Sequence, residues 1–247
     1  MAEKIIVCKD LTKQFGNFKA VDKVSFEVNK AEIFGFLGAN GAGKTTAMRI
    51  LCGLSFPSGG SATVAGFDVY RQQEQIKRHI GYMSQKFSLY DDLTVQENIR
   101  FYAGVYGVSK KEIKIRSKAV LETLGLEKEA SKPVGELPLG WKQKLAFSVA
   151  IFHRPEIVFL DEPTGGVDPV TRRQFWEMIY QAAADGITVF VTTHYMDEAE
   201  YCDRVTIMVD GRIEALDTPA NLKKQFKAGS MDQVFYQLAR GAKRSSD

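Results

Sequence analysis

One stretch limits the possible folds of this chain more than any other: Gly38-Ala39-Asn40-Gly41-Ala42-Gly43-Lys44-Thr45-Thr46. It follows an apolar run at 33–37 and precedes a helix-like run at 47–51. Glycines let the backbone curl so that successive N–H groups point at a phosphate chain, and the next helix adds the positive end of its dipole. This context predicts a P-loop, in which Lys44 reaches the β- and γ-phosphates and the Thr45 hydroxyl contacts Mg²⁺. The alternative is a glycine-rich turn that ends in Lys-Thr by chance.

The rest of the chain alternates between strand-like and helix-like runs. Strand-like runs lie at 5–9, 24–28, 33–37, 61–66, 80–83, 157–162, 187–193, 205–209 and 212–215. Alternation of apolar strands with helices around a glycine loop implies a parallel α/β sheet. Residues 13–18 are expected to form a loop that carries two aromatic residues, and Asp210-Gly211 is a strong hairpin signal.

One block of the chain departs from this alternation. Between 94 and 153 we expect mainly helices, because Thr94–Glu97 and Ser109–Glu112 are capping-box sequences ahead of apolar-periodic runs. Gly107 and Gly125 lie where C-terminal caps are expected. The block therefore reads as a helical insertion in a strand-rich core. Outside it, helices are expected at 47–51, 70–78, 169–183 and 232–239.

Composition excludes some classes of protein. The 247 residues are 45% hydrophobic, which is enough for one large cored unit or two small ones. The net charge is only +3 and no long block of like charge occurs, so no nucleic-acid partner is expected. The three cysteines lack metal-like or paired spacing, which favours buried, reduced thiols. We expect no signal peptide, and no window approaches the roughly 18–20 apolar residues of a membrane span.

Two adjacent acids end the apolar run at 157–160. Strand alternation separates the directions of Asp161 and Glu162, so one could face Mg²⁺ and the other the water beside the γ-phosphate. A P-loop enzyme needs both an acid near the metal and a group that positions the attacking water. The alternative is a pair of solvent-facing acids at a strand end.

Two more polar side chains follow strand-like runs. Ligands of parallel α/β sheets bind at the carboxyl ends of the strands, where Leu37, Gln85, Asp161 and His194 are all expected to lie. His194 is a candidate for contacting the γ-phosphate, although a lone histidine is usually a packed or surface residue. Gln85 has an amide oxygen that can ligate Mg²⁺ or orient water, or it is an ordinary polar loop residue.

The ordered motifs together resemble those of the ATP-binding cassette (ABC) transporter ATPases over nearly the whole chain. The matching residues are Phe15, the P-loop, Gln85, Leu137-Pro138-Leu139-Gly140-Trp141, 157–162, Gly165-Gly166-Val167-Asp168 and His194. The Leu-Pro-Leu-Gly-Trp form, with Asp232-Gln233-Val234-Phe235 near the end, resembles the branch that powers drug and antibiotic exporters with separately encoded permeases.

The resemblance implies a fold and a division of the chain. We expect a P-loop NTPase core with a mostly parallel sheet flanked by helices, an N-terminal antiparallel β subdomain and an inserted α-helical subdomain. Residues 1–247 would form a single ABC ATPase domain. Residues 1–85 and 154–228 would form the core with its β subdomain, 86–153 the helical subdomain, and 229–247 a C-terminal extension.

The resemblance also implies roles for the site residues. Phe15 would stack on adenine, and Gly38 to Thr46 would hold the phosphates of ATP. Mg²⁺ would be bound by three oxygen-bearing side chains, those of Thr45, Gln85 and Asp161. Glu162 would be the catalytic base and His194 the contact to the γ-phosphate.

The family works as a head-to-tail pair of cassettes, so a second copy or a related ATPase is an expected partner. Each ATP would lie between one P-loop and the partner's signature loop, defined here as Leu137 to Trp141. Asp168 would cap its helix and also contact the partner; the cap alone is the simpler interpretation. A permease would bind the helical subdomain, with the aromatic-rich stretch 87–106 as its contact surface or else as plain helical core.

The signature loop departs from the family pattern. The usual form begins Leu-Ser-Gly-Gly, and here Pro138 and Leu139 replace that serine and first glycine. Proline can still open the helix, so the field at its N-terminus survives while one hydroxyl is lost. A hydrogen bond to a charged group contributes about 1.5–3 kcal/mol, so we expect a weaker closed state rather than abolished hydrolysis. Gly165 for serine and Phe15 for tyrosine are mild departures.

The function expected from these motifs is that of an ATP-hydrolysing motor of a multidrug or antibiotic exporter. The chain would be cytoplasmic and attached to the inner face of the membrane through its permease. One alternative is a non-transport ABC ATPase that remodels nucleic acid or ribosomes. Another is a nucleotide-gated regulatory subunit that hydrolyses ATP weakly, which the altered signature loop favours slightly.

Overall fold

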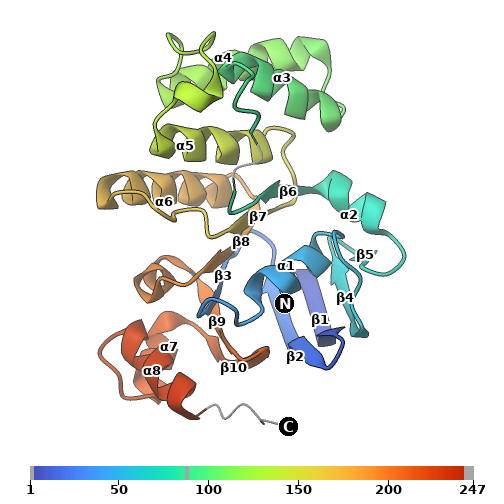
Figure 1. The fold of residues 1–247 in the computed structure, drawn as a ribbon, viewed down its shortest axis with the longest axis vertical. Helices are drawn as coiled ribbons and strands as arrows, with labels where there is room; N and C mark the ends of the chain where they lie inside the picture. Colours follow the sequence, from blue (N-terminus) through green and yellow to red (C-terminus); the bar gives the residue numbers. More distant parts are fainter. Residues whose placement is uncertain (1–2, 87–88, 242–247) are drawn as a thin grey trace.

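The computed structural model describes residues 3–86 and 89–241. Figure 1 shows a central sheet with an antiparallel sheet beside it, a group of helices at one end of the molecule, and the last two helices at the other. The first two residues of the expected surface stretch 87–106 lie outside the described residues. The predicted α/β fold class, with its antiparallel β subdomain and helical insertion, is confirmed.

The central sheet carries the P-loop. Its strand order in the described part of the chain is β10-β9-β3-β8-β7-β6. The bounds are β3 (Ile33–Gly38), β6 (Ile80–Met83), β7 (Ile157–Asp161), β8 (Thr188–Thr193), β9 (Arg204–Val209) and β10 (Arg212–Asp217). All pairs are parallel except β9 with β10, which join in the hairpin predicted at Asp210-Gly211. Every residue of β3, β7 and β8 is buried, as expected for parallel strands covered on both faces.

The second sheet is antiparallel, in the order β2-β1-β4-β5. Its strands are β1 (Lys4–Phe15), β2 (Phe18–Asn29), β4 (Gly59–Val64) and β5 (Phe67–Asp68). The loop predicted at 13–18 is wrong, because β1 and β2 stay paired to the end, where Phe15 lies opposite Phe18. Gly16, with φ of +56°, permits this tight turn. The hairpin therefore places Phe15 at its tip.

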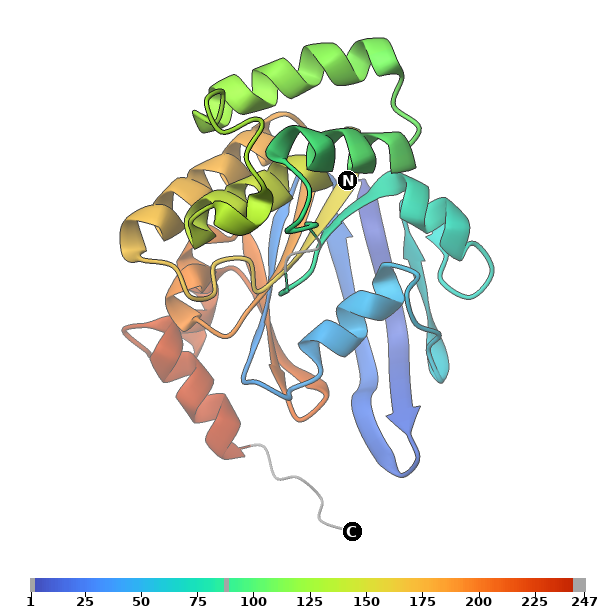
Figure 2. The same ribbon diagram turned by 45° about the horizontal axis from the view of Figure 1, so that its top comes forward.

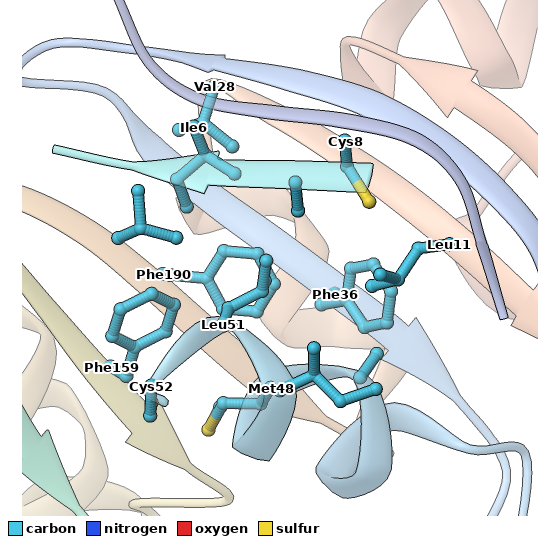
Figure 3. Close-up of a cluster of buried hydrophobic side chains, with 14 of the residues drawn as sticks. Ile6, Cys8, Leu11, Val28, Phe36, Met48, Leu51, Cys52, Phe159 and Phe190 are labelled. Atoms are coloured by element: carbon cyan, nitrogen blue, oxygen red, sulfur yellow. The ribbon is translucent and has the colours of Figure 1, made fainter. Parts of the chain in front are cut away.

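The main core lies between the two sheets and helix α1 (Lys44–Leu51). Figure 3 shows Ile6, Cys8 and Leu11 of β1 across from Met48 and Leu51 of α1. Five phenylalanines, Phe26, Phe34, Phe36, Phe159 and Phe190, form one aromatic cluster with ring centroids 5.2–6.2 Å apart. All three cysteines are buried and free, and burial raises the pKa of the Cys8 thiol to about 12. The core thus fixes β3 and α1, which flank the P-loop.

The helical block has a core of its own. It contains α3 (Val95–Val105), α4 (Lys110–Leu124), the 3-10 turn η1 (Val134–Glu136) and α5 (Leu139–Ala150), as the top of Figure 1 shows. Thr94 and Glu97 form the predicted capping box, and Gly125 ends α4 in the left-handed conformation. Val95, Ile99, Leu121, Leu145 and Phe152 are among the residues of its buried cluster.

The remaining helices cover the central sheet. They are α2 (Gln73–His79), α6 (Pro169–Ala184), the 3-10 turn η2 (Met196–Tyr201), α7 (Pro219–Gln225) and α8 (Met231–Gly241). Helix α2 begins three residues later than predicted, because Asp68 accepts hydrogen bonds from the N–H groups of Tyr70 and Arg71 and holds them in a turn. Helix α7 is absent from the prediction, although Thr218 at its N-cap and Pro219 are a start signal. None of the described helices is long and apolar enough to cross a membrane.

A stacked pair joins the helical block to the central sheet. The rings of Tyr106 and His153 lie 3.6 Å apart and nearly parallel, and Nε2 of His153 is 3.1 Å from the carbonyl oxygen of Ile80 on β6. Close approach continues at Gly81, where a Cβ would lie 2.2 Å from the carbonyl oxygen of Ala150. Burial lowers the pKa of His153 from its ordinary value of 6.5 to about 4. The histidine at this junction is therefore neutral in the folded chain.

This histidine predicts an acid-dependent loss of stability. Because its folded pKa is depressed, the unfolded chain binds a proton as the pH falls below 6.5 while the folded chain resists it down to about 4. His153→Phe keeps a flat ring and removes the titration, so its free energy of unfolding should fall less than the parental value between about pH 7.5 and about pH 5. Urea denaturation at both pH values measures this. His153→Gln should share the reduced pH dependence; a parental pH dependence in both variants contradicts the assignment.

Candidate active site

The P-loop connects β3 to α1 and leaves the start of the helix open. The residue before α1, Gly43, has φ of 103°, and no side chain caps the first turn of the helix. That turn also contains no acidic residue. Uncapped N–H groups at a helix N-terminus favour an anion, so the backbone here suits a phosphate group.

Neighbouring strands hold the loop tightly. A Cβ on Gly43 would lie 2.1 Å from the carbonyl oxygen of Ala20, and one on Gly38 would lie 2.5 Å from that of Met208. The hairpin turn between β9 and β10 also holds it, because the N–H of Gly211 donates to the carbonyl oxygen of Ala42. Only glycine fits where these backbones approach so closely. The loop is thus built by segments from both ends of the chain.

Lys44 lies inside the loop with 4% of its surface exposed. Its ammonium donates to the carbonyl oxygens of Gly38, at 2.9 Å, and Ala39, at 3.1 Å. Its Nζ is also 3.3 Å from Oε1 of Glu162. A buried ammonium needs such partners, since an unpaired charge away from water is costly. Thr45 and Ala39 to Gly41 remain exposed, while Thr46 is half-buried.

Asp161 ends β7 with 3% of its surface exposed. One oxygen, Oδ1, accepts hydrogen bonds from Thr45, at 3.0 Å, and from Thr192 on β8, at 2.7 Å. Carboxylate and hydroxyl oxygens are the ligands that Mg²⁺ prefers, and Mg²⁺ keeps several ligands from water and phosphate. Among the described residues, no cluster of three His, Cys, Asp or Glu side chains forms a cage for a metal. The donor set therefore fits Mg²⁺ brought in with phosphates.

Glu162 gathers donors from three other segments. Its Oε2 is 3.1 Å from the amide nitrogen of Gln85 and 3.0 Å from Nδ1 of His194, while Oε1 faces Lys44. Its own N–H donates to Thr192. With φ of +49°, uncommon outside glycine, Glu162 turns the chain away from the line of β7. Asp161 and Glu162 therefore face different partners, and the strand ends meet at one edge of the sheet.

The signature loop opens α5 beside α6. Pro138 is the N-cap, Leu137 is buried, Leu139 is 42% exposed, and Trp141 packs against the core of the helical block. A Cβ on Gly140 would lie 2.6 Å from Cγ2 of Thr171 on α6. Figures 1 and 2 both show α5 running alongside α6. The two helix N-termini are therefore neighbours.

Asp168 caps α6. Its Oδ1 accepts from the N–H groups of Val170, at 2.9 Å, and Thr171, at 3.0 Å, and its Oδ2 accepts from the Thr171 hydroxyl at 2.5 Å. These bonds hold the pKa of Asp168 below its ordinary value. The predicted capping role is thereby confirmed, and a contact to a partner stays a prediction.

Phe15 stands apart from Asp161 and Glu162, at the tip of the β1–β2 hairpin. Its ring is 55% exposed, and Nζ of Lys13 lies 5.0 Å from its centroid. The same ammonium donates to the carbonyl oxygen of Phe56. An exposed aromatic face is available for stacking on a flat ligand.

Sequence reasoning missed Thr192. Its hydroxyl donates to Asp161 and accepts from the N–H of Glu162, so it connects both acids to β8. The parallel register places Thr192 directly opposite Asp161. The available signal was a hydroxyl two residues before His194, at a strand end next to the acids.

Known proteins are similar in sequence to this chain. Residues 21–165 match the family described as ABC transporter. The probable multidrug ABC transporter ATP-binding protein YbhF of Escherichia coli (strain K12) is 48% identical over 241 residues, covering 96% of this chain and 42% of that protein. The linearmycin resistance ATP-binding protein LnrL of Bacillus subtilis (strain 168) is 36% identical over 231 residues, covering 93% of this chain and 74% of that protein.

A solved structure of an ABC transporter subunit has the same fold as this chain. The ATP binding subunit of an ABC transporter superimposes with a TM-score of 0.86 at 29% identity, covering 95% of this chain and 99% of that one. The chain belongs to the ABC transporter family and has the fold of its ATPase subunits. This confirms the resemblance inferred from the motifs. The chain spans about two fifths of the length of YbhF.

The loop geometry predicts unequal effects at two glycines. Both have positive φ, 82° at Gly41 and 103° at Gly43, but a Cβ on Gly41 meets no atom within 4 Å. Gly41→Ala should therefore lower the free energy of unfolding only by the strain of an alanine at positive φ, about 1–2 kcal/mol. Gly43→Ala adds a clash with Ala20, which should raise the loss to about 3–5 kcal/mol. Urea denaturation of the two variants measures the difference; equal losses would contradict the described loop.

Proposed function

We propose that this chain binds and hydrolyses ATP as the motor subunit of an exporter. The observation that carries the proposal is the carboxylate of Glu162, which lies beside the P-loop within reach of Lys44, Gln85 and His194. Basic and polar groups that converge on one carboxylate next to a phosphate cradle suit phosphoryl transfer to water.

Binding uses the groups that surround the loop. The N–H groups at the start of α1 and the ammonium of Lys44 hold the phosphates. Thr45, Asp161 and Gln85 hold Mg²⁺, which when bound neutralises charge on the phosphate oxygens. Phe15 offers its exposed ring to adenine, with Lys13 behind it. The buried position of Asp161 beside Thr45 supports this side of the site for the metal.

Hydrolysis uses the second acid. Glu162 accepts a proton from a water molecule whose oxygen forms a bond to the γ-phosphorus, while the bond from that phosphorus to the β–γ bridging oxygen breaks. ADP and inorganic phosphate leave. Lys44 and His194, which now contact Glu162, are the donors placed to contact the transferred phosphoryl group. In this scheme the two donors change partners from carboxylate to phosphate.

Closure requires a second copy or a related ATPase. The N-termini of α5 and α6 lie together, and Pro138, Leu139 and Asp168 are exposed there. These segments present a helix N-terminus to the γ-phosphate held by the partner. Pro138 lacks the hydroxyl that the family's serine supplies, which weakens the closed pair by about 1.5–3 kcal/mol.

The permease binds where the helical block meets the core. A groove of ≈ 650 Å³ lies between α2, β6 and the end of α3. Its lining residues include Leu54, Ile80, Tyr82, Val105 and Tyr106. Val105 is 65% exposed, so a cytoplasmic helix of the permease can bury it. The names of YbhF and LnrL, which refer to multidrug transport and linearmycin resistance, support an exporter at the inner face of the membrane.

The assignment of the base predicts the effect of one substitution. Glu162→Gln keeps the size of the side chain and removes proton acceptance, so kcat for ATP hydrolysis should fall about 10²–10⁴-fold. ATP binding should persist, and size-exclusion chromatography with ATP should show a trapped dimer. Glu177→Gln, an exposed acid on α6, is the control and should retain parental turnover. A parental rate in Glu162→Gln refutes the base, and an inactive parental chain favours the regulatory alternative.

The groove predicts that one substitution will prevent binding to the permease without affecting ATP hydrolysis. The chain should co-purify from cells with a multi-span membrane protein that mass spectrometry identifies. Val105→Asp puts a charge into the apolar contact and should abolish this recovery, while ATP hydrolysis by the isolated chain stays intact. Ile115→Asp on α4 is the matched control, since Ile115 is comparably exposed but lies outside the groove. Recovery of ribosomes alone supports the non-transport alternative.

A further inference from the structure

Arg172, the fourth residue of α6, reaches the segment that follows His194. Its guanidinium carbon lies 4.4 Å from the centroid of the Tyr195 ring. The Tyr195 ring in turn lies 4.2 Å from the ring of His194, and the N–H of Tyr195 donates to Thr193. A guanidinium over an aromatic face is attractive and needs a defined orientation. A continuous line of contacts, in which the two rings are tilted by 36°, therefore runs from α6 to the histidine that contacts Glu162, and we call this line the stack.

Acids on η2 hold the guanidinium over the ring. Nη1 of Arg172 is 3.5 Å from Asp197, and Nε is 3.6 Å from Oε1 of Glu198. Glu198 is fully buried, and the same oxygen accepts a hydrogen bond of 2.5 Å from Thr164. Thr164 belongs to the segment between Glu162 and α6, so Glu198 ties that segment to Arg172. The stack is thus anchored at both of its ends.

This network has unused hydrogen-bonding capacity. Nε of Arg172 and Oε2 of Glu198 are buried, and neither has a hydrogen-bond partner among the described residues. The 3.6 Å separation of Nε and Oε1 exceeds a normal N–H···O bond, which is about 2.7–3.2 Å. A buried polar group without a partner is unfavourable. A displacement of the start of α6 relative to η2 would change this separation and, with it, the position of the guanidinium over the Tyr195 ring.

Helix α6 also carries Asp168. The N–H of Arg172 donates to the carbonyl oxygen of Asp168, so the cap and the arginine move as one helical turn. We infer that Arg172 is a positioning residue: it positions the ring of His194 through its contact with the Tyr195 ring. Because Arg172 belongs to the first turn of α6, the position of His194 then depends on the position of that turn. This rests on the proposed function, because it links the surface expected to meet a second copy with the histidine expected to meet the γ-phosphate.

The first test observes His194 directly. The chain has three histidines, so a ¹⁵N-histidine-labelled sample gives a simple NMR spectrum, and His194→Ala assigns the signals of interest. Arg172→Leu should shift the ring signals of His194 and leave those of His79 and His153 in place. Arg173→Leu is the matched control, because this neighbour is exposed and pairs only loosely with Glu177, at 3.9 Å; it should shift none.

The second test is kinetic. Arg172→Leu should lower kcat for ATP hydrolysis about tenfold, as misplacement of a catalytic group does, with KM for ATP changed by less than about twofold. Tyr195→Phe keeps the ring and should retain the parental rate, whereas Tyr195→Leu should match Arg172→Leu. A loss of stability alone does not predict this rescue by the aromatic variant.

The outcomes separate this inference from the proposed function. Unmoved His194 signals in folded Arg172→Leu, or an unchanged kcat in an active enzyme, would overturn the inference. If Arg172→Leu does not fold, Arg172→Lys keeps the charge without the planar group and should shift the same His194 signals; parental signals there overturn the inference equally. If the parental chain does not hydrolyse ATP, the proposed function fails while the NMR comparison still tests the stack.

Discussion

The site depends on one carboxylate that would be difficult to accommodate alone. Glu162 leaves β7 in a left-handed conformation and is held by Lys44 of the P-loop, Gln85 after β6 and His194 after β8. Each donor stands at the end of a different segment, and the parallel register of the sheet brings those ends to one edge. A carboxylate with only 9% of its side chain exposed needs such partners, so the sheet topology and the electrostatics require each other.

Short sequence motifs predicted the structural features that depend on neighbouring residues alone. Glycines that need positive φ, apolar strands that end in acids, and the Thr94 capping box are all written in short stretches of sequence. The α/β class and the meeting of Gln85, Glu162 and His194 followed from them and from the rule that parallel strands end at one edge. Each of these features is specified by a few neighbouring residues, and the order of the strands in the sheet brings the features together.

Other features depend on packing between distant segments and have no short signature. Thr192 matters because register places it opposite Asp161. The stack of Arg172 on Tyr195 depends on how α6 lies against η2. The hairpin that carries Phe15 is longer than its alternation indicated, because β1 and β2 stay paired beyond the end of the alternating run, up to Phe15 opposite Phe18. Such contacts are set by tertiary structure, which overrides local preference.

The backbone segments that pack around the P-loop have a consequence for biosynthesis. The P-loop is synthesised early, yet it packs against Met208 and Gly211, which belong to the β9–β10 hairpin and are synthesised much later. A nascent chain that has exposed only the P-loop motif therefore lacks the backbone that shapes it. Domains fold as units once their distant contacts are available. Nucleotide can be captured only after β9 and β10 have emerged from the ribosome, which ties ligand binding to completion of the sheet.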